Sequence, residues 1–245
     1  MTATITPSAK MPHLTRANPE IRLQDYYQAL KFYLEIPSHY IDRIVFLENS
    51  DTDLDRFRQL ASNYPNKQVE FISVSSNYAV ERGKGYGEFR MLDQGLEQCS
   101  SIAPDDVFWK VTGRLKVSNL QQLIETSPKN YLLYCDMRNV PIIGEKLGGN
   151  QWMELRVFSC TLSAYDRFLR GEYHKVTDSS VSIEKVLFQT FKSKLKDDLI
   201  VPRFTRQPIV EGYSGFGDVS YQSTSYKLKN LLRQVTRAAT PWLWL

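Results

Sequence analysis

Residues 82–88 (RGKGYGE) combine three glycines with a lysine, and they are the first segment that could do chemistry. Glycine lets a backbone approach a ligand closely and expose its N–H groups, and Lys84 beside Gly85 adds a point charge suited to a phosphate. Glu88 then opens an expected helix. The segment matches neither a Walker loop nor a GxGxxG fingerprint, so a plain flexible turn before a helix stays an alternative.

A second group of polar residues lies on the expected strand at residues 108–114 (FWKVTGR). Side chains alternate along a strand, so Lys110, Thr112 and Arg114 share one face, with Gly113 between the last two. Two cations held on one strand face suit a diphosphate. The alternative is a solvated strand face.

Polar residues also follow two other expected strands. Glu48 and Asn49 follow the strand at residues 43–47, and Asp136 and Arg138 follow a second buried strand. Ligands of open α/β sheets lie beyond the carboxyl ends of the strands, so these residues are candidates for a site. A turn-capping role for Asp136 is the alternative.

Residues 212–218 (GYSGFGD) form a further candidate segment. Ser214 and Gly215 could wrap the edge of a ligand with a hydroxyl and backbone N–H groups. The alternative is an ordinary surface loop.

The elements that must position these residues alternate along the first third of the chain. The expected order is strand 2–6, helix 22–35, strand 43–47, helix from about 54, and strand 69–74. This order predicts an α/β fold: a single domain with a mostly parallel, Rossmann-like central sheet flanked by helices. The second half is less regular. Strands are expected at 107–117 (interrupted by Gly113), 131–135 and 152–159, and helices at 119–126, 162–169, 182–195 and 225–239.

Composition narrows the class of protein. The chain has 245 residues, 42% of them hydrophobic and 24% charged, which is typical of a globular protein. A net charge of +4 suits anionic ligands but is too small to predict a nucleic-acid binder. Three cysteines without metal-ligand spacing, no signal peptide and no apolar run of about 18 residues predict a cytoplasmic protein.

The order of several short motifs resembles a known group of enzymes. ENS, RGKGYGE, FWKVTGR, a strand followed by Asp-x-Arg, ELRVFS, SIE on a helix and EGYSGFGD occur in turn between Thr4 and Tyr221. This order resembles bacterial polysaccharide- and lipopolysaccharide-type glycosyltransferases, which use nucleotide-sugar donors on a GT-A fold. KGxGE and KxTGR are the most specific elements.

The resemblance implies a division of labour along the chain. Residues 1–118 would bind the nucleotide-sugar, with Lys84, Gly85 and Glu88 in the donor site. Its diphosphate would lie beside Lys110, Thr112, Gly113 and Arg114. Residues 119–224 would shape the side of the site that takes a saccharide or lipid-linked acceptor. The implied reaction transfers a sugar to a surface polysaccharide or glycolipid.

The metal motif of many GT-A enzymes is not where it is expected. Asp51-Thr52-Asp53 looks like a helix cap, and Asp105-Asp106 precedes its strand. We therefore predict no metal ligands and expect cationic side chains to neutralise the leaving diphosphate. A role for magnesium or manganese stays open.

Glycosyl transfer with inversion also needs a base for the acceptor hydroxyl. Asp136, Glu88 and Glu184 are the candidates, in no order. The histidines, at positions 13, 39 and 174, lie in polar loop-like segments and are expected to take no part.

Two other functions compete with this interpretation. A sugar nucleotidyltransferase would need its glycine-rich loop directly after the first strand, where residues 7–20 contain no glycine. A non-catalytic protein that binds a partner or a membrane surface on the same fold is the other alternative.

The C-terminal segment, residues 225–245, predicts a contact with membranes. Lys229, Arg233 and Arg237 recur every four residues, leucines fill much of the remaining surface, and the chain ends in PWLWL. A basic helix with tryptophans suits the surface of an anionic bilayer, which would make the protein peripheral at the inner face of the membrane. Packing of this helix on the sheet is the alternative.

Overall fold

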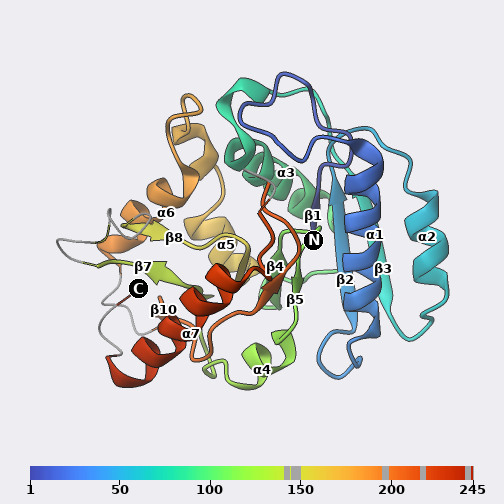
Figure 1. Cartoon of the computed structure of the whole chain (residues 1–245). Coiled ribbons are helices and arrows are strands. Elements are labelled where there is room, and N and C mark those ends of the chain that lie inside the picture. The colour runs from blue at the N-terminus through green and yellow to red at the C-terminus, as the bar shows by residue number, and fades with distance from the viewer. Residues whose placement is uncertain (141–143, 145–149, 195–198, 216–218, 241–243, 245) are drawn as a thin grey trace.

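The computed structural model describes residues 1–140, 144, 150–194, 199–215, 219–240 and 244. Its N-terminal third has the alternation of strands and helices that the sequence predicts. Three parallel strands lie in the order β1-β2-β3, connected through two helices. The elements are β1 (Thr2–Ala3), α1 (Pro19–Glu35), β2 (Arg43–Glu48), α2 (Asp55–Ser62) and β3 (Gln68–Ser73). Figure 1 shows this unit on one side of the molecule.

Helix α1 begins three residues earlier than its apolar periodicity indicates. The Asn18 side chain accepts hydrogen bonds from the backbone N–H groups of Glu20 and Ile21, and Pro19 follows as the first helical residue. An Asn cap followed by proline fixes a helix start, because both satisfy the unpaired N–H groups of the first turn.

The second half of the chain builds an antiparallel extension of this sheet. Its four strands lie in the order β10-β6-β9-β4, and β9 runs antiparallel to both β4 and β6. Their bounds are β4 (Val107–Val111), β6 (Leu133–Tyr134), β9 (Val157–Thr161) and β10 (Ile200–Val201). A parallel bridge between Thr2 and Thr112 connects the two parts. The central sheet is therefore mixed, and the expected parallel arrangement applies to the first three strands and to the β6–β10 pair.

Shorter elements complete the described chain. The stretch expected at 107–117 is interrupted around Gly113, as predicted, and gives β4 and β5 (Lys116–Val117). The strand expected at 152–159 is divided into β8 (Trp152–Met153) and β9. Two antiparallel ribbons, β5–β11 and β7–β8, lie outside the central sheet. The remaining elements are η1 (Val80–Arg82), α3 (Lys84–Gln98), β5 (Lys116–Val117), α4 (Leu120–Glu125), β7 (Met137–Arg138), β8 (Trp152–Met153), α5 (Leu162–Phe168), η2 (Glu172–Lys175), α6 (Ile183–Lys192), β11 (Val210–Glu211) and α7 (Thr224–Ala239).

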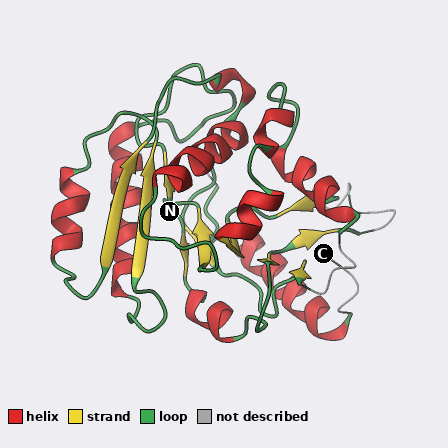
Figure 2. Ribbon diagram, turned by 180° about the vertical axis from the view of Figure 1, so that it is seen from behind, coloured by secondary structure: helices red, strands yellow, loops and turns green. Residues whose placement is uncertain are grey.

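Helices cover both faces of the N-terminal strands, as Figure 2 shows. On β2, Ile44 and Phe46 pack in the apolar cluster that contains α1 and α2. Val45 and Leu47 pack against the other cluster, which contains α3, α5 and α6. Alternation along a parallel strand thus fills two cores, one on each face of the sheet.

Helix α7 is packed with its polar side inward. Its apolar side chains are more than half exposed: 66% for Leu228 and 55% each for Leu231, Leu232 and Val235. The partly buried side chains are mostly polar: Tyr226, Asn230, Arg233, Thr236 and Arg237. The expectation that Arg237 belongs to an outward basic row is wrong, because its guanidinium donates to the Asp136 carboxylate at 2.5 Å.

The C-terminal tip is placed only at Trp244, whose carbonyl accepts from the backbone N–H of Asn139 at 2.9 Å. Trp244 packs against the core. Trp242, the other tryptophan of the predicted anchor, lies outside the described residues. In the part of the chain that the structure describes, no helix combines the length and apolarity that a membrane crossing requires.

Candidate functional site

A cavity of about 660 Å³ lies where the two halves of the chain meet. Its walls come from β1, the loop after it, the first turns of α3 and α6, the residues Thr112, Arg114 and Leu115, and the inner side of α7. Eight Lys or Arg residues and three glutamates line it, so its charge favours anions. The cations are Arg22, Arg82, Lys84, Arg114, Arg138, Arg156, Lys229 and Arg233, and the carboxylates are Glu88, Glu154 and Glu184.

The N-terminus of α3 opens onto this cavity. Gly83 precedes the helix with a φ of 94°, a conformation that favours glycine, and no side chain caps the first turn. Lys84, Gly85 and Tyr86 line the cavity. A helix N-terminus presents unpaired N–H groups and a partial positive charge, which together bind anions.

The structure corrects the prediction of a glycine-rich loop. The chain is helical from Lys84 onward, and Gly85 serves a close approach between α3 and α6. A Cβ on Gly85 would lie 2.3 Å from Cγ2 of Ile183. The glycines after Gly83 therefore allow helix packing, and the first turn of α3 supplies the N–H groups that the loop was expected to supply.

Lys84 and Arg114 converge at the same point of the cavity. A Cβ built on Gly215 would lie 2.8 Å from a terminal guanidinium nitrogen of Arg114 and 3.0 Å from Lys84 Nζ. Ser214 lies beside them on the cavity wall. Burial and, to a smaller extent, the charge of Arg114 lower the pKa of Lys84 to about 8. The two cations repel each other at this separation, and a bound anion would reduce that repulsion.

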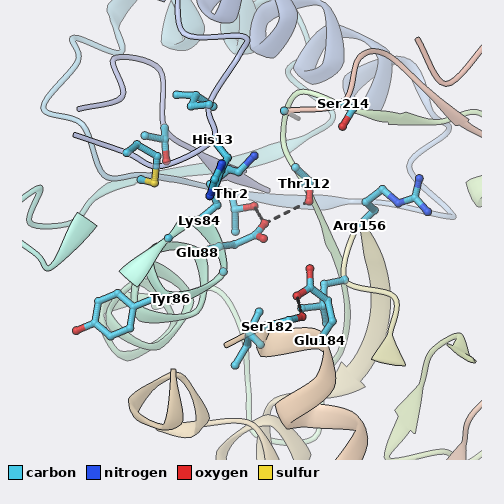
Figure 3. A pocket seen from close by; sticks show the side chains of 18 of the residues that line it. Thr2, His13, Lys84, Tyr86, Glu88, Thr112, Arg156, Ser182, Glu184 and Ser214 are labelled. Carbon is cyan, nitrogen blue, oxygen red and sulfur yellow. Dashed lines mark hydrogen bonds between the residues drawn. The ribbon is translucent and has the colours of Figure 1, made fainter. Parts of the chain in front are cut away.

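Glu88 and Lys110 form a buried ion pair at the base of the cavity. Lys110 Nζ lies 2.6 Å from Glu88 Oε1, and the hydroxyls of Thr2 and Thr112 donate to the same oxygen at 2.6 and 3.2 Å. Burial raises the pKa of Glu88, but the charge of Lys110 and these hydrogen bonds outweigh it, so that the net shift is downward. Figure 3 shows Glu88 between the two threonines.

The placement of Lys110 differs from its predicted role. Its side chain is 1% exposed, and the ammonium is held by Glu88 and by the carbonyl of Leu155 at 2.6 Å. The predicted face of the strand is correct, but its cation lies under the cavity wall and is neutralised there. Thr112 and Arg114, on the same face, line the cavity.

Glu184 enters the cavity from the first turn of α6, on a different helix from Glu88 (Figure 3). Ser182 Oγ donates to its carboxylate at 2.6 Å. Burial raises the pKa of Glu184 above its ordinary value, and the charges of Glu154 and Glu88 add to the rise. A carboxylate whose pKa is raised toward neutrality is suited to take a proton during a reaction.

Arg138 and Trp152 form another part of the wall, on β7 and β8. The guanidinium of Arg138 lies 4.7 Å from the ring centroid of Trp152. Next to them, Glu154 is paired with Arg156, whose Nε lies 2.7 Å from Glu154 Oε1. Burial raises the pKa of Glu154, but Arg156 outweighs it and sets that pKa at about 2.

Besides Lys110, four predicted site residues do not line the cavity. Glu48 is buried and accepts from the backbone N–H groups of Ile5 and Ser50, and Asn49 accepts from Thr4 Oγ1. Both hold the segment after β1. Gly113 donates its N–H to the carbonyl of Thr2, and Asp136 is paired with Arg237. These residues support the walls of the cavity, and Asp136 has its carboxylate occupied.

The described residues contain no cluster of side chains that commonly bind metals. No group of three or more His, Cys, Asp or Glu side chains gathers among them. Asp53 accepts from the N–H of Asp55 at the start of α2, which is the capping role expected for it, and Asp51 accepts from Ser76. The three cavity glutamates are on separate elements, and Glu88 and Glu154 are occupied by cations.

Sequence reasoning missed several cavity residues. His13, dismissed with the other histidines, lines the cavity from the loop after β1. Trp152, Glu154, Arg156 and Tyr226 line its other side. Residues 154–156 lie in the motif ELRVFS. Their closely spaced opposite charges are typical of an exposed strand, and the sequence alone does not show that the fold buries them.

Comparison with known proteins adds little to this description. No family model matches the sequence, and no curated protein matches it. Among solved structures, mouse xyloside xylosyltransferase 1 in its apo form is similar over 73% of this chain and 79% of that chain, at 11% identity and a TM-score of 0.39. A similarity this weak supports no statement about function, so the function must be argued from the cavity.

Proposed function

We propose that this protein is a glycosyltransferase that uses a nucleotide-sugar donor. The observation that carries the proposal is the convergence of Lys84, Arg114 and the open N-terminus of α3 on one point of a cationic cavity. A diphosphate fits this arrangement, because N–H groups and two cations can all donate to its oxygens. The volume of the cavity is within the range of sites for ligands of this size.

In the proposed reaction, an acceptor hydroxyl attacks the anomeric carbon of the donor sugar. A carbon–oxygen bond forms, the bond from that carbon to the diphosphate breaks, and the diphosphate leaves with the electron pair. Lys84 and Arg114 stabilise the negative charge of the leaving group. Glu184 takes the proton of the acceptor hydroxyl, because its carboxylate has the raised pKa that a base needs.

Glu88 has a supporting role in this proposal. Its low pKa makes it a weak base, and three donors already share one of its oxygens. It holds Lys110 and Thr112 in place beneath the diphosphate. No step requires a metal ion.

Equilibrium binding of nucleoside diphosphates tests the donor site. We expect UDP, GDP, CDP or ADP to bind the wild-type protein, and Arg114→Gln to weaken that binding at least tenfold, since a charge-assisted hydrogen bond contributes about 1.5–3 kcal/mol. Arg167→Gln is the matched control, because Arg167 is exposed on α5 outside the cavity. If no nucleotide binds, or both variants bind alike, the donor site is wrong.

We further propose that the acceptor is a saccharide or a lipid-linked saccharide, and that the protein works at the cytoplasmic surface of an anionic membrane. The exposed apolar side of α7 supports this proposal. Lys227 flanks that side, and no acidic residue follows position 218. An apolar helix face bordered by positive charge suits lipid headgroups, whereas pairing with a second copy would bring like charges together.

A further inference from the structure

Charged side chains beneath α7 carry an excess of positive charge. The group has three arginines and two carboxylates: Arg138, Arg156, Arg237, Asp136 and Glu154. Asp136 pairs with Arg237, and Glu154 pairs with Arg156. Both carboxylates are therefore committed, and burying the remaining positive charge is costly without an anion.

Arg138 is the member of this group that lines the cavity without an ion-pair partner among the described residues. Its guanidinium is stacked over Trp152, which fixes its plane and leaves its N–H donors for another partner. Burial has the largest influence on the pKa of Arg138 and lowers it, although the charges of Glu154 and Asp136 act in the opposite direction.

Further donors line the cavity. Trp152 is one of the lining residues, and its buried indole N–H has no hydrogen-bond partner among the described residues. A buried polar group without a partner costs free energy. Lys229 and Arg233 reach the cavity from α7.

This group lies on other elements than the Lys84–Arg114 pair. Lys84 begins α3, whereas Arg138 and Trp152 lie on the β7–β8 ribbon, and Figure 1 shows the ribbon and the helix in different parts of the molecule. Figure 3 shows Arg156, a neighbour of this group, on the opposite side of the cavity from Lys84. Glu184 projects from α6 toward the space between them.

We propose that Arg138, Trp152, Lys229 and Arg233 form a second anion subsite, which binds a phosphate group carried by the acceptor. The assignment of the phosphate to the acceptor rests on the proposed function, whereas the subsite itself rests on its own residues. With the donor diphosphate at Lys84 and Arg114, Glu184 stands between the two anions, where a base for the acceptor hydroxyl is needed. The acceptor that carries this phosphate group is a lipid phosphate or a sugar phosphate, because both present the same anionic phosphate to the subsite.

Calorimetric titration with inorganic pyrophosphate, in the presence of saturating UDP or another nucleoside diphosphate that binds, tests the subsite. We expect pyrophosphate still to bind when the nucleotide site is full. Arg138→Gln should weaken this second binding tenfold or more and leave nucleotide affinity within twofold, whereas Arg114→Gln should do the reverse. Arg167→Gln is the charge-matched control. Titrations with farnesyl phosphate and glucose 6-phosphate then distinguish the lipid source from the sugar source.

The outcomes separate the two proposals. If no nucleotide binds but pyrophosphate binding is lost in Arg138→Gln, the subsite holds and the donor assignment fails. If Arg138→Gln weakens nucleotide and pyrophosphate equally, there is one anion site and the inference is wrong. A thermal melt gives a second measurement: removing an uncompensated cation should leave the melting temperature of Arg138→Gln equal or higher. A clear fall would make Arg138 a structural partner of Glu154 and overturn the subsite.

Discussion

At the scale of single residues, the Glu88–Lys110 pair decides whether the cavity keeps its shape. The Lys110 ammonium is almost completely buried, and Glu88 is its charged partner. Removing one member of such a pair leaves the other charge uncompensated, which costs about 3–5 kcal/mol. Lys110 is therefore needed for the stability of the fold and is not available to contact a donor.

The pair predicts a specific double-mutant result. Glu88→Gln should lower the free energy of unfolding by about 3–5 kcal/mol, and Glu88→Gln combined with Lys110→Met should recover most of that loss. Urea unfolding of the single and double variants measures both values. Additive losses in the double variant would mean that the two side chains do not act as a pair.

The same pair has a dependence on pH whose sign follows from the pKa of Glu88. Its pKa is lower in the folded protein than in the unfolded chain. The contribution of Glu88 to the stability of the fold is therefore fully present above the pKa of glutamate in the unfolded chain, about 4.3. It is lost as the pH falls through the lower pKa that Glu88 has in the folded protein.

Lys84 predicts how donor binding depends on pH. With a pKa of about 8, its ammonium is mostly protonated at pH 7 and mostly neutral at pH 9. Nucleoside diphosphate affinity should be steady below pH 8 and fall about tenfold by pH 9, because the protonated form attracts the phosphates. Lys84→Arg keeps its charge and should abolish the fall. A wild-type affinity that is flat to pH 9 would exclude Lys84 from the phosphate site.

At the scale of elements, the sequence predicts the type of each element, helix or strand, more reliably than the side of the element that packs against the rest of the protein. Alternation correctly placed Lys110 and Thr112 on one face of the strand at 107–111. It could not show that this face meets Glu88 on α3, because that contact depends on how α3 crosses the sheet. The Arg138–Trp152 contact could not be predicted from the sequence either, because it depends on the register in which β7 pairs with β8.

Helix α7 shows this limit most clearly. Its apolar and basic sides are evident from the sequence, and a soluble helix normally buries the apolar side. Here the inner side meets Asp136, Arg156 and a cationic cavity, all of which need polar partners. The leucines are left outside, and only the surrounding structure could show that.

The outward leucines predict binding to membranes. The protein should cosediment with phosphatidylglycerol vesicles at low salt, and Leu231→Gln with Leu232→Gln should abolish this. The matched control is Ile21→Gln with Val107→Gln, two exposed apolar residues on α1 and β4 whose exposed fractions are 45% and 49%. Substitution is preferable to removing the helix, because truncation would leave Asp136 without Arg237.

Two results would contradict this prediction. The wild-type protein could ignore the vesicles, or the Leu231 and Leu232 variant could turn a dimer into a monomer in light scattering. The second result would assign the apolar side of α7 to another copy of the chain.

At the scale of the whole molecule, the cavity draws on both halves of the chain. The N-terminal half supplies Lys84, Glu88 and Arg114, and the C-terminal half supplies Glu184, Arg138 and α7. This matches a division in which 1–118 holds the donor and 119–224 holds the acceptor, which stays a prediction. The hydroxyls of Thr2 and Thr112 both donate to Glu88, at the bridge that connects the N-terminal strands with the rest of the central sheet.

The distribution of carboxylates also predicts that activity is independent of divalent metals. The described residues offer no group of three or more acidic, His or Cys ligands, and eight cations line the cavity. In the proposed reaction these cations, rather than a metal ion, neutralise the diphosphate. Turnover should therefore survive excess chelator within about twofold. Loss of turnover that magnesium or manganese restores would show that a metal takes over the role given to Lys84 and Arg114.

Turnover of nucleotide-sugars tests the central claim most directly. The wild-type protein, incubated with a panel of UDP-, GDP- and other nucleotide-sugars, should release nucleoside diphosphate from at least one of them, slowly without acceptor. Transfer to an acceptor should fall about 100-fold or more in Glu184→Gln, since a general base contributes about 10²–10⁴-fold. Nucleotide affinity should not change in that variant. If no nucleotide-sugar is turned over, or if Glu184→Gln transfers sugar at the wild-type rate, the account of this cavity is contradicted.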